Sequence, residues 1–245
     1  MGDWTTALVV AVFFGATLIR SAFGFGEALI AVPLLALVLP VKVAAPIAVL
    51  LSITVAAVVV AQDWRDVHMK SATRLVLWTL LGIPLGLLLL RSASESLVKG
   101  ILGIVVAVFS ILALRHGGWY QLHDDRRAWI FGMIAGVLGG AYGMNGPPLV
   151  MYGSLRRWSP AQFRATLQGY FLPASIMGLA GYWVAGFWTP VVTYYYLVSL
   201  PTALLAIVLG RAINRRLDAD RFLVYIHAGL IVSGVVLLLQ ALLGS

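Results

Sequence analysis

Apolar residues dominate the chain in long runs that short polar stretches separate. A helix needs about 20 residues to cross a hydrocarbon layer, and several of these runs reach that length. Ten-residue stretches of alternating polarity, which mark membrane β-barrels, do not occur. The pattern therefore predicts an all-α integral membrane protein with 8–10 transmembrane segments. The apolar segments are 4–22, 27–39, 43–62, 73–91, 97–115, 128–141, 147–155, 166–187, 190–210 and 222–243.

Composition supports this prediction and narrows the class of partner. Of the 245 residues, 61% are hydrophobic and only 11% are charged, a balance that a soluble domain does not have. The net charge of +8 would suit a nucleic acid, but the basic residues sit in short loops between apolar segments. We therefore expect a lipid bilayer, and no nucleic acid, as the surrounding partner.

The basic residues favour one set of loops. Thirteen Lys and Arg residues fall in the loops 63–74, 115–127, 156–164 and 211–221, against three in the alternate loops. Basic loops stay on the cytoplasmic side of a membrane. This bias predicts that the basic loops are cytoplasmic and that both chain ends lie outside. The assignment holds whether segments 27–39 and 147–155 cross the membrane or are re-entrant arms.

The second five segments repeat the spacing of the first five. At an offset of 119 residues, Phe23-Gly24 aligns with Tyr142-Gly143 and Gly26 aligns with Asn145. A unit with an odd number of segments must begin its second copy on the opposite side of the membrane. We therefore expect two inverted repeats, residues 1–120 and 121–245, an arrangement common in secondary transporters.

Each repeat contains a glycine-rich interruption at matching places. The first reads Phe23-Gly24-Phe25-Gly26, and the second runs from Tyr142-Gly143 through Asn145 and Gly146 to Pro147-Pro148. Non-helical backbone survives at membrane depth only inside protein or beside a wet cavity. We expect paired broken helices whose N-terminal ends, starting near Ala28 and Pro147, meet at the midplane and bind an anion. Glycines that serve only close helix packing are the alternative.

Two alternative roles fit each charged residue beside the first interruption. Arg20 inside segment 4–22 would complement an anion, or its side chain would reach the cytoplasmic surface. Glu27 would begin a half-helix and pair with Arg20 across the turn, or it would carry a proton that couples transport.

Three further residues are candidates for the same site. Arg164 and Gln168 are four residues apart near the start of a helix, so they share one face. They would line a path to the second interruption, or Arg164 would anchor the helix in the cytoplasm. Tyr142 would donate to a ligand oxygen, or would only pack.

Motifs of enzymes and metal sites were not found. The chain has no cysteine and no His-Glu-x-x-His, Gly-x-Ser-x-Gly or Gly-x-x-x-x-Gly-Lys sequence, which mark metal, acyl-transfer and nucleotide sites. We therefore expect no catalytic residue, metal or cofactor. A transporter would draw energy from its substrate gradient, from a coupling ion, proton or sodium, or from a separate partner.

The two interruptions resemble the signatures of the sulfite exporter TauE/SafE family. Ser21 to Gly26 with Val32-Pro33-Leu34-Leu35 is similar to the first signature, and Gly139 to Pro148 with Arg164-Ala165-Thr166 is similar to the second. The resemblance covers nearly the whole chain. It implies a permease of the bacterial inner membrane for sulfur-containing anions such as sulfite or organosulfonates. Glu27 and Asn145 depart from the small residues usual in the family.

The sequence thus predicts a secondary transporter of a small anion that works by alternating access around the two interruptions. An anion channel with the same helices, or an intramembrane enzyme or assembly factor, are the alternatives. The oligomeric state stays open. The predicted substrate-binding residues are Arg20, Ser21, Gly24, Gly26, Glu27, Tyr142, Gly143, Asn145, Gly146, Pro147, Arg164 and Gln168.

Overall fold

The regular structure in the described part of the chain is helical. The computed structural model describes residues 3–63, 67–114, 121–158 and 160–214, with short pieces between 231 and 243. Helices begin and end close to the predicted segments, because glycine, proline and polar residues punctuate the apolar runs. They are α1 (Asp3–Phe23), α2 (Glu27–Ala36), α3 (Val41–Asp63), α4 (Met69–Ser92), α5 (Glu95–Leu114), α6 (Ala128–Tyr142), α7 (Gly146–Leu155), α8 (Pro160–Val184) and α9 (Pro190–Asn214).

Within the described residues, five helices have the length and hydropathy to cross a bilayer. They are α1, α3, α4, α5 and α9. α8 is also 25 residues long and contains Gln168 among other polar residues. It begins at Pro160, earlier than the predicted 166, because proline is well suited to a first helical turn. The predicted segment 222–243 lies mostly outside the described residues.

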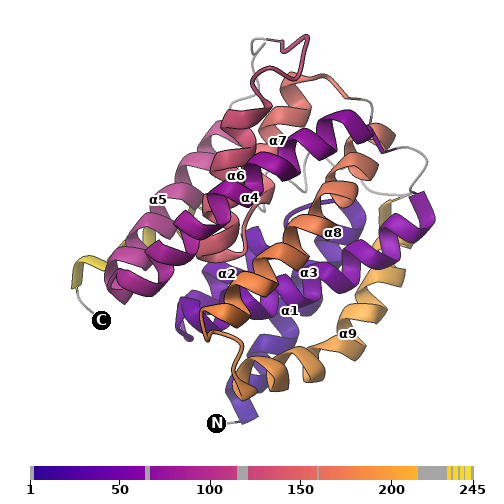
Figure 1. Cartoon of the computed structure of the whole chain (residues 1–245). Helices are drawn as coiled ribbons and strands as arrows, with labels where there is room; N and C mark the ends of the chain where they lie inside the picture. The colour runs from indigo at the N-terminus through magenta and orange to yellow at the C-terminus, as the bar shows by residue number, and fades with distance from the viewer. Residues whose placement is uncertain are drawn as a thin grey trace.

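Three helix pairs organise the packing. α4 packs along α6, α1 packs along α9, and α3 packs along α8, as Figure 1 shows. α3 is the most buried of the five spanning candidates, so it forms the centre. α4 turns an outer stripe to the surroundings, with Leu77, Leu81, Leu85 and Leu88 all more than half exposed. Such a stripe suits contact with lipid.

Glycines let α4 and α6 approach closely. A Cβ built on Gly136 would lie 2.3 Å from the carbonyl oxygen of Thr79, and one on Gly86 would lie 2.1 Å from that of Val137. Both obstacles are backbone atoms, so the neighbouring helix cannot yield by a change of side-chain rotamer. Gly132 and Gly140 make similar approaches. Glycines at these positions therefore serve close helix packing.

Asp125 ties three loops together at one end of the molecule. Its carboxylate accepts hydrogen bonds from Ser71 and Tyr152 and lies 3.5 Å from the guanidinium of Arg156. Burial raises the pKa of Asp125, but the hydrogen bonds from Tyr152 and Ser71 and the charge of Arg156 outweigh it, so the pKa lies below its usual value. The loops before α4, before α6 and after α7 therefore gather at the same end.

The alternate loops gather at the opposite end. The Glu95 carboxylate at the start of α5 accepts a hydrogen bond from the Val41 amide at the start of α3. The ammonium of Lys42 lies over the ring of Phe187, which follows α8. The start of α3 therefore lies near the end of α8. At the other end of the molecule, the amide of His68, which follows α3, donates to Thr166 near the start of α8. α3 and α8 therefore run in opposite directions.

Candidate functional site

The first interruption separates α1 from α2 at two glycines. Gly24 and Gly26 have φ values of 85° and 105°, a left-handed conformation that only glycine adopts at little cost. The Gly24 amide still donates to the Arg20 carbonyl at 2.6 Å, so α1 closes before the chain turns. α2 then begins at Glu27. The predicted helix interruption at Gly24–Gly26 is confirmed.

The second interruption follows the same plan. α6 ends at Tyr142, and Gly143 takes φ 67°. The amides of Gly143 and Met144 donate to the carbonyls of Gly139 and Leu138, the pattern of a glycine-terminated helix. α7 starts at Gly146.

Local sequence explains how α7 starts. Pro147 and Pro148 fill its first turn, where a missing N–H loses no helical bond. Asn145 occupies the predicted N-cap position, but its side chain makes no capping bond. Instead it interacts with the hydroxyl of Tyr170.

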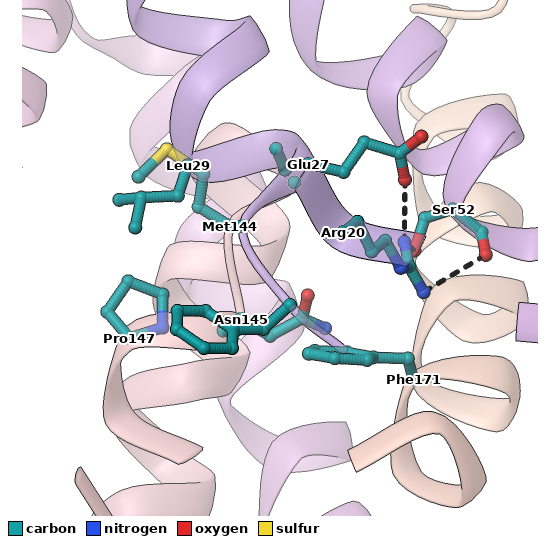
Figure 2. Close-up of a pocket in the computed structure, with 13 residues that line it drawn as sticks. Arg20, Glu27, Leu29, Ser52, Met144, Asn145, Pro147 and Phe171 are labelled. Carbon is teal, nitrogen blue, oxygen red and sulfur yellow. Dashed lines mark hydrogen bonds and ion pairs between the residues drawn. The ribbon is translucent and has the colours of Figure 1, made fainter. Parts of the chain in front are cut away.

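Both interruptions line one pocket. Phe25 to Leu29 come from the first, and Gly143 to Pro147 come from the second. Arg20 of α1, Ser52 of α3 and Phe171 of α8 complete the lining. Figure 2 shows Arg20 between Glu27 and Ser52, with Asn145 and Pro147 across the pocket. Segments more than 110 residues apart in the sequence thus meet, as the sequence predicted.

The pocket lies halfway along the central helix. Ser52 is eleven residues from each end of α3, which runs from Val41 to Asp63. At 1.5 Å per residue, that is about 16 Å from either end. If α3 crosses a bilayer, its middle lies near the midplane.

Arg20 points into the protein and not toward a surface. It is 3% exposed. Its Nη1 donates to Glu27 Oε2 at 2.6 Å and to Ser52 Oγ at 2.7 Å. Its Nη2 donates to Gln168 Oε1 at 3.0 Å. The alternative in which this side chain reaches the cytoplasmic surface is therefore wrong.

Glu27 is buried beside Arg20 and has a second donor. It is 1% exposed, and the Thr17 hydroxyl donates to its Oε1 at 2.6 Å. The predicted pairing of Glu27 with Arg20 across the turn is confirmed. A buried ion pair of this kind persists only when hydrogen bonds satisfy the remaining oxygens and N–H groups.

Three polar residues that the sequence did not single out extend this network. Thr17 binds Glu27, Ser52 binds Arg20, and Ser175 of α8 lies 3.1 Å from the Ser52 hydroxyl. The Gln168 amide donates to the Gly24 carbonyl at 2.7 Å. A signal existed, because Thr17 lies one turn before Arg20 and Ser52 interrupts an apolar run.

Phe171 forms one wall of the pocket. Its ring centre lies 5.0 Å from the Arg20 guanidinium carbon, a cation–π distance. Arg20 makes this contact in addition to its hydrogen bonds to Glu27, Ser52 and Gln168. The sequence offered no signal that distinguished Phe171 from other phenylalanines of the chain.

The two helices that start at the pocket offer different numbers of free backbone N–H groups, which the sequence analysis did not anticipate. The first turn of α2 carries backbone N–H groups without helical partners. The first turn of α7 includes Pro147 and Pro148, which have no N–H. The predicted pair of amide-rich ends is therefore amide-rich on the α2 side, while α7 contributes the amides of Asn145 and Gly146.

The structure does not bring every predicted residue to the pocket. Tyr142 is fully buried, and its hydroxyl donates to the carbonyl of Val98 on α5. Ser21 packs against α9, where a Cβ added to Gly210 would lie 2.6 Å from the Cβ of Ser21. Both follow from helix phase, since neighbours of a lining residue point elsewhere. The side chain of Arg164 lies outside the described residues.

Comparison with protein families identifies a match over most of the chain. A family model described as sulfite exporter TauE/SafE matches residues 8–237. No curated protein and no solved structure matches the chain.

Proposed function

The chain belongs to the sulfite exporter TauE/SafE family, and from that premise we propose that it is a secondary transporter of a sulfur-containing anion, sulfite or an organosulfonate. With its apolar helices, family membership makes it a multi-pass membrane protein. Alternating access around the two interruptions is the proposed mechanism. The bacterial inner membrane is the proposed location.

The positions of the helices support two repeats. Adding 119 to the bounds of α2, 27–36, gives 146–155, which are the bounds of α7. The same addition moves the end of α1 from 23 to 142, where α6 ends, and the start of α3 from 41 to 160, where α8 starts. Residues 1–120 and 121–245 would be the two copies.

The packing supports their inversion. α1 packs on α9 and α6 packs on α4, and exchanging the two repeats converts one pair into the other. The equivalent helices α3 and α8 pack on each other in opposite directions. A two-fold axis in the membrane plane would produce both features. The pocket, which both interruptions line, would lie on that axis.

The loops agree with the proposed sidedness. The loops that Asp125 joins are three of the four basic ones, and they share one end of the molecule. We assign that end to the cytoplasm, because basic loops remain there.

The observation that carries the function is the buried guanidinium of Arg20 at the pocket. A charge at this depth is costly and marks a functional site by default. Sulfite and sulfonates present several oxygens around one sulfur, which a guanidinium recognises through more than one N–H. Gly26 and Gly143 place no side chain in the pocket, so a ligand can approach the backbone at these two positions. Gly24 and Gln168 hold the first interruption in place behind it.

A binding and transport screen tests the proposal. Purified protein is titrated with sulfite, methanesulfonate, sulfate and acetate, and the best binder is then followed into liposomes. Counterflow of labelled anion with saturable kinetics is expected of a transporter. Rapid conductive flux without counterflow would indicate a channel instead.

A double variant that keeps the net charge of the pocket unchanged tests the role of Arg20. Arg20→Gln combined with Glu27→Gln removes both charges, so no unpaired charge stays buried. Losing charge-assisted bonds worth about 2–3 kcal/mol predicts a roughly 30- to 150-fold weaker affinity. Arg91→Gln, at an exposed arginine of α4, is the control and should bind as wild type does. Unchanged affinity in the double variant would remove Arg20 from the binding site.

A further inference from the structure

Glu27 occupies the position on Arg20 that an anion from the pocket would need. Both residues line the pocket. Arg20 Nη1 is taken by Glu27 and Ser52, and Nη2 by Gln168 and the Ser52 carbonyl. Of the three guanidinium nitrogens of Arg20, only Nε has no hydrogen-bond partner among the described residues. The charged partner on this guanidinium is Glu27, so an anion that pairs with Arg20 through Nη1 takes the place of the Glu27 carboxylate.

If an anion pairs with Arg20, no other positive charge among the described pocket residues is there to pair with Glu27. Arg20 and Glu27 are the ionisable residues among those that line it. α3 presents Ser52, the second interruption presents Asn145, and α8 presents Phe171. None of these side chains titrates, and neither does Gln168 of α8, which bonds Arg20 from behind the pocket. α2 also packs on α5, whose Glu95 is bound to the Val41 amide at the far end.

Displacement thus leaves a buried carboxylate without its counter-charge. Two negative groups beside one guanidinium, away from water, repel each other strongly. A carboxyl group in that situation avoids the cost by taking up a proton. As an acid, Glu27 keeps the hydrogen bond from Thr17 at Oε1 and places its proton on Oε2.

We propose that Glu27 couples transport to protons: one singly charged anion binds Arg20 as Glu27 takes up one proton. This inference rests on the proposed function of the site as an anion transporter. The step balances, because the carboxylate, a proton from water and the anion become a carboxylic acid and a new ion pair with Arg20. The pocket's net charge is unchanged.

Two consequences define the coupling. The empty site is a closed and neutral Arg20–Glu27 pair, so it can reorient without exposing an unpaired charge. A sodium ion is disfavoured as the coupling ion. Sodium binds oxygen ligands, whereas the group beside the Glu27 carboxylate is the Arg20 guanidinium. The substrate class narrows to anions that carry one charge, such as a sulfonate or hydrogen sulfite.

Proton counting by calorimetry tests the inference. Anion binding is measured at one pH in buffers of different ionisation enthalpy, and the slope gives the protons taken up. Methanesulfonate is the first probe, because it stays singly charged at every pH used. Sulfite is the second, with its own protonation subtracted. Wild type should take up about one proton per anion, and its affinity should fall tenfold for each pH unit in the alkaline range.

Glu27→Gln imitates the protonated acid and keeps a hydrogen-bonding partner for Arg20. It should bind with no proton uptake and with an affinity independent of pH. In liposomes it should exchange labelled anion yet fail to accumulate it under an inward proton gradient. Glu95→Gln, a matched change outside the pocket, should keep the wild-type proton count.

The failures of the two proposals differ. Anion binding by wild type without proton uptake would overturn the coupling and leave the transporter proposal standing. Wild type that binds neither probe would overturn both. Because the proton count is taken on wild type, it does not depend on the folding of the Gln variant.

Discussion

The glycine seam between α4 and α6 makes a sharp prediction about stability. In Gly136→Ala, the new Cβ would lie 2.3 Å from the Thr79 carbonyl oxygen and 2.8 Å from the Cα of Gly82. Ordinary contact begins near 3.4 Å, so the helices must separate by about 1 Å. Overpacking typically costs about 1–3 kcal/mol, and the upper part of that range applies because backbone atoms form the obstacle.

Gly15→Ala is the matched control. Gly15 lies in α1, and a Cβ there has nothing within 4 Å. In a helix this change gains about 0.4–1 kcal/mol by restricting the unfolded chain. Gly136→Ala makes the same gain, so the two variants should differ by the packing cost alone, roughly 2–3 kcal/mol. At about 2–4 °C per kcal/mol for a chain of this size, the expected gap in Tm is roughly 4–12 °C.

Thermal unfolding of the purified variants in one detergent measures this gap. Near-equal melting temperatures for Gly136→Ala and Gly15→Ala would refute the close approach of α4 and α6. The position of α6 would then be wrong, and with it that of the second interruption, which α6 carries.

Other predictions follow from the same contacts. Asp125→Asn should lower the free energy of unfolding by about 1–3 kcal/mol, because it weakens the bonds from Ser71 and Tyr152 and the attraction of Arg156; chemical denaturation measures this. Because the folded-state pKa of Asp125 lies below its usual value, its ionic stabilisation is present above about pH 4 and is lost as the pH falls through the lowered pKa. Wild type and the Asn variant should thus converge in stability in acid; a constant gap would contradict the assignment. Gly143→Ala forces a left-handed residue and places a Cβ 3.0 Å from the Ala45 carbonyl oxygen, so it should cost about 1–3 kcal/mol and weaken anion binding; an unaffected Tm would refute the break geometry.

The helix breaks were predictable because their chemistry is local. Gly26 and Gly143 take left-handed conformations that other residues resist, and Pro147 starts a helix wherever it follows such a turn. The pairing of Arg20 with Glu27 was also predictable, since they are seven residues apart and only the glycine turn lies between their helices. Local signals of this kind do not depend on how the helices pack against one another.

The remaining polar partners depend on which helix faces lie together. Ser52 and Ser175 meet only because α3 and α8 pack along each other, and a single sequence does not state that pairing. Tyr142 shows the opposite error. It adjoins the second interruption in sequence, yet the phase of α6 directs its hydroxyl to Val98 on α5.

The central claim is that the two interruptions together enclose one anion. The chain contains no cysteine, so single cysteines can be introduced without a background. Ala28→Cys marks the first interruption and Gly146→Cys marks the second, where an added Cβ would meet only the Phe171 ring at 3.9 Å. Ser92→Cys, exposed at the end of α4, is the control.

The rate of thiol modification by a small charged reagent, with and without bound anion, is the deciding measurement. The account predicts that the anion slows modification at both interruptions and leaves the Ser92 position unchanged. Protection at one interruption alone, or at neither while the anion is bound, would contradict the claim that they form one site.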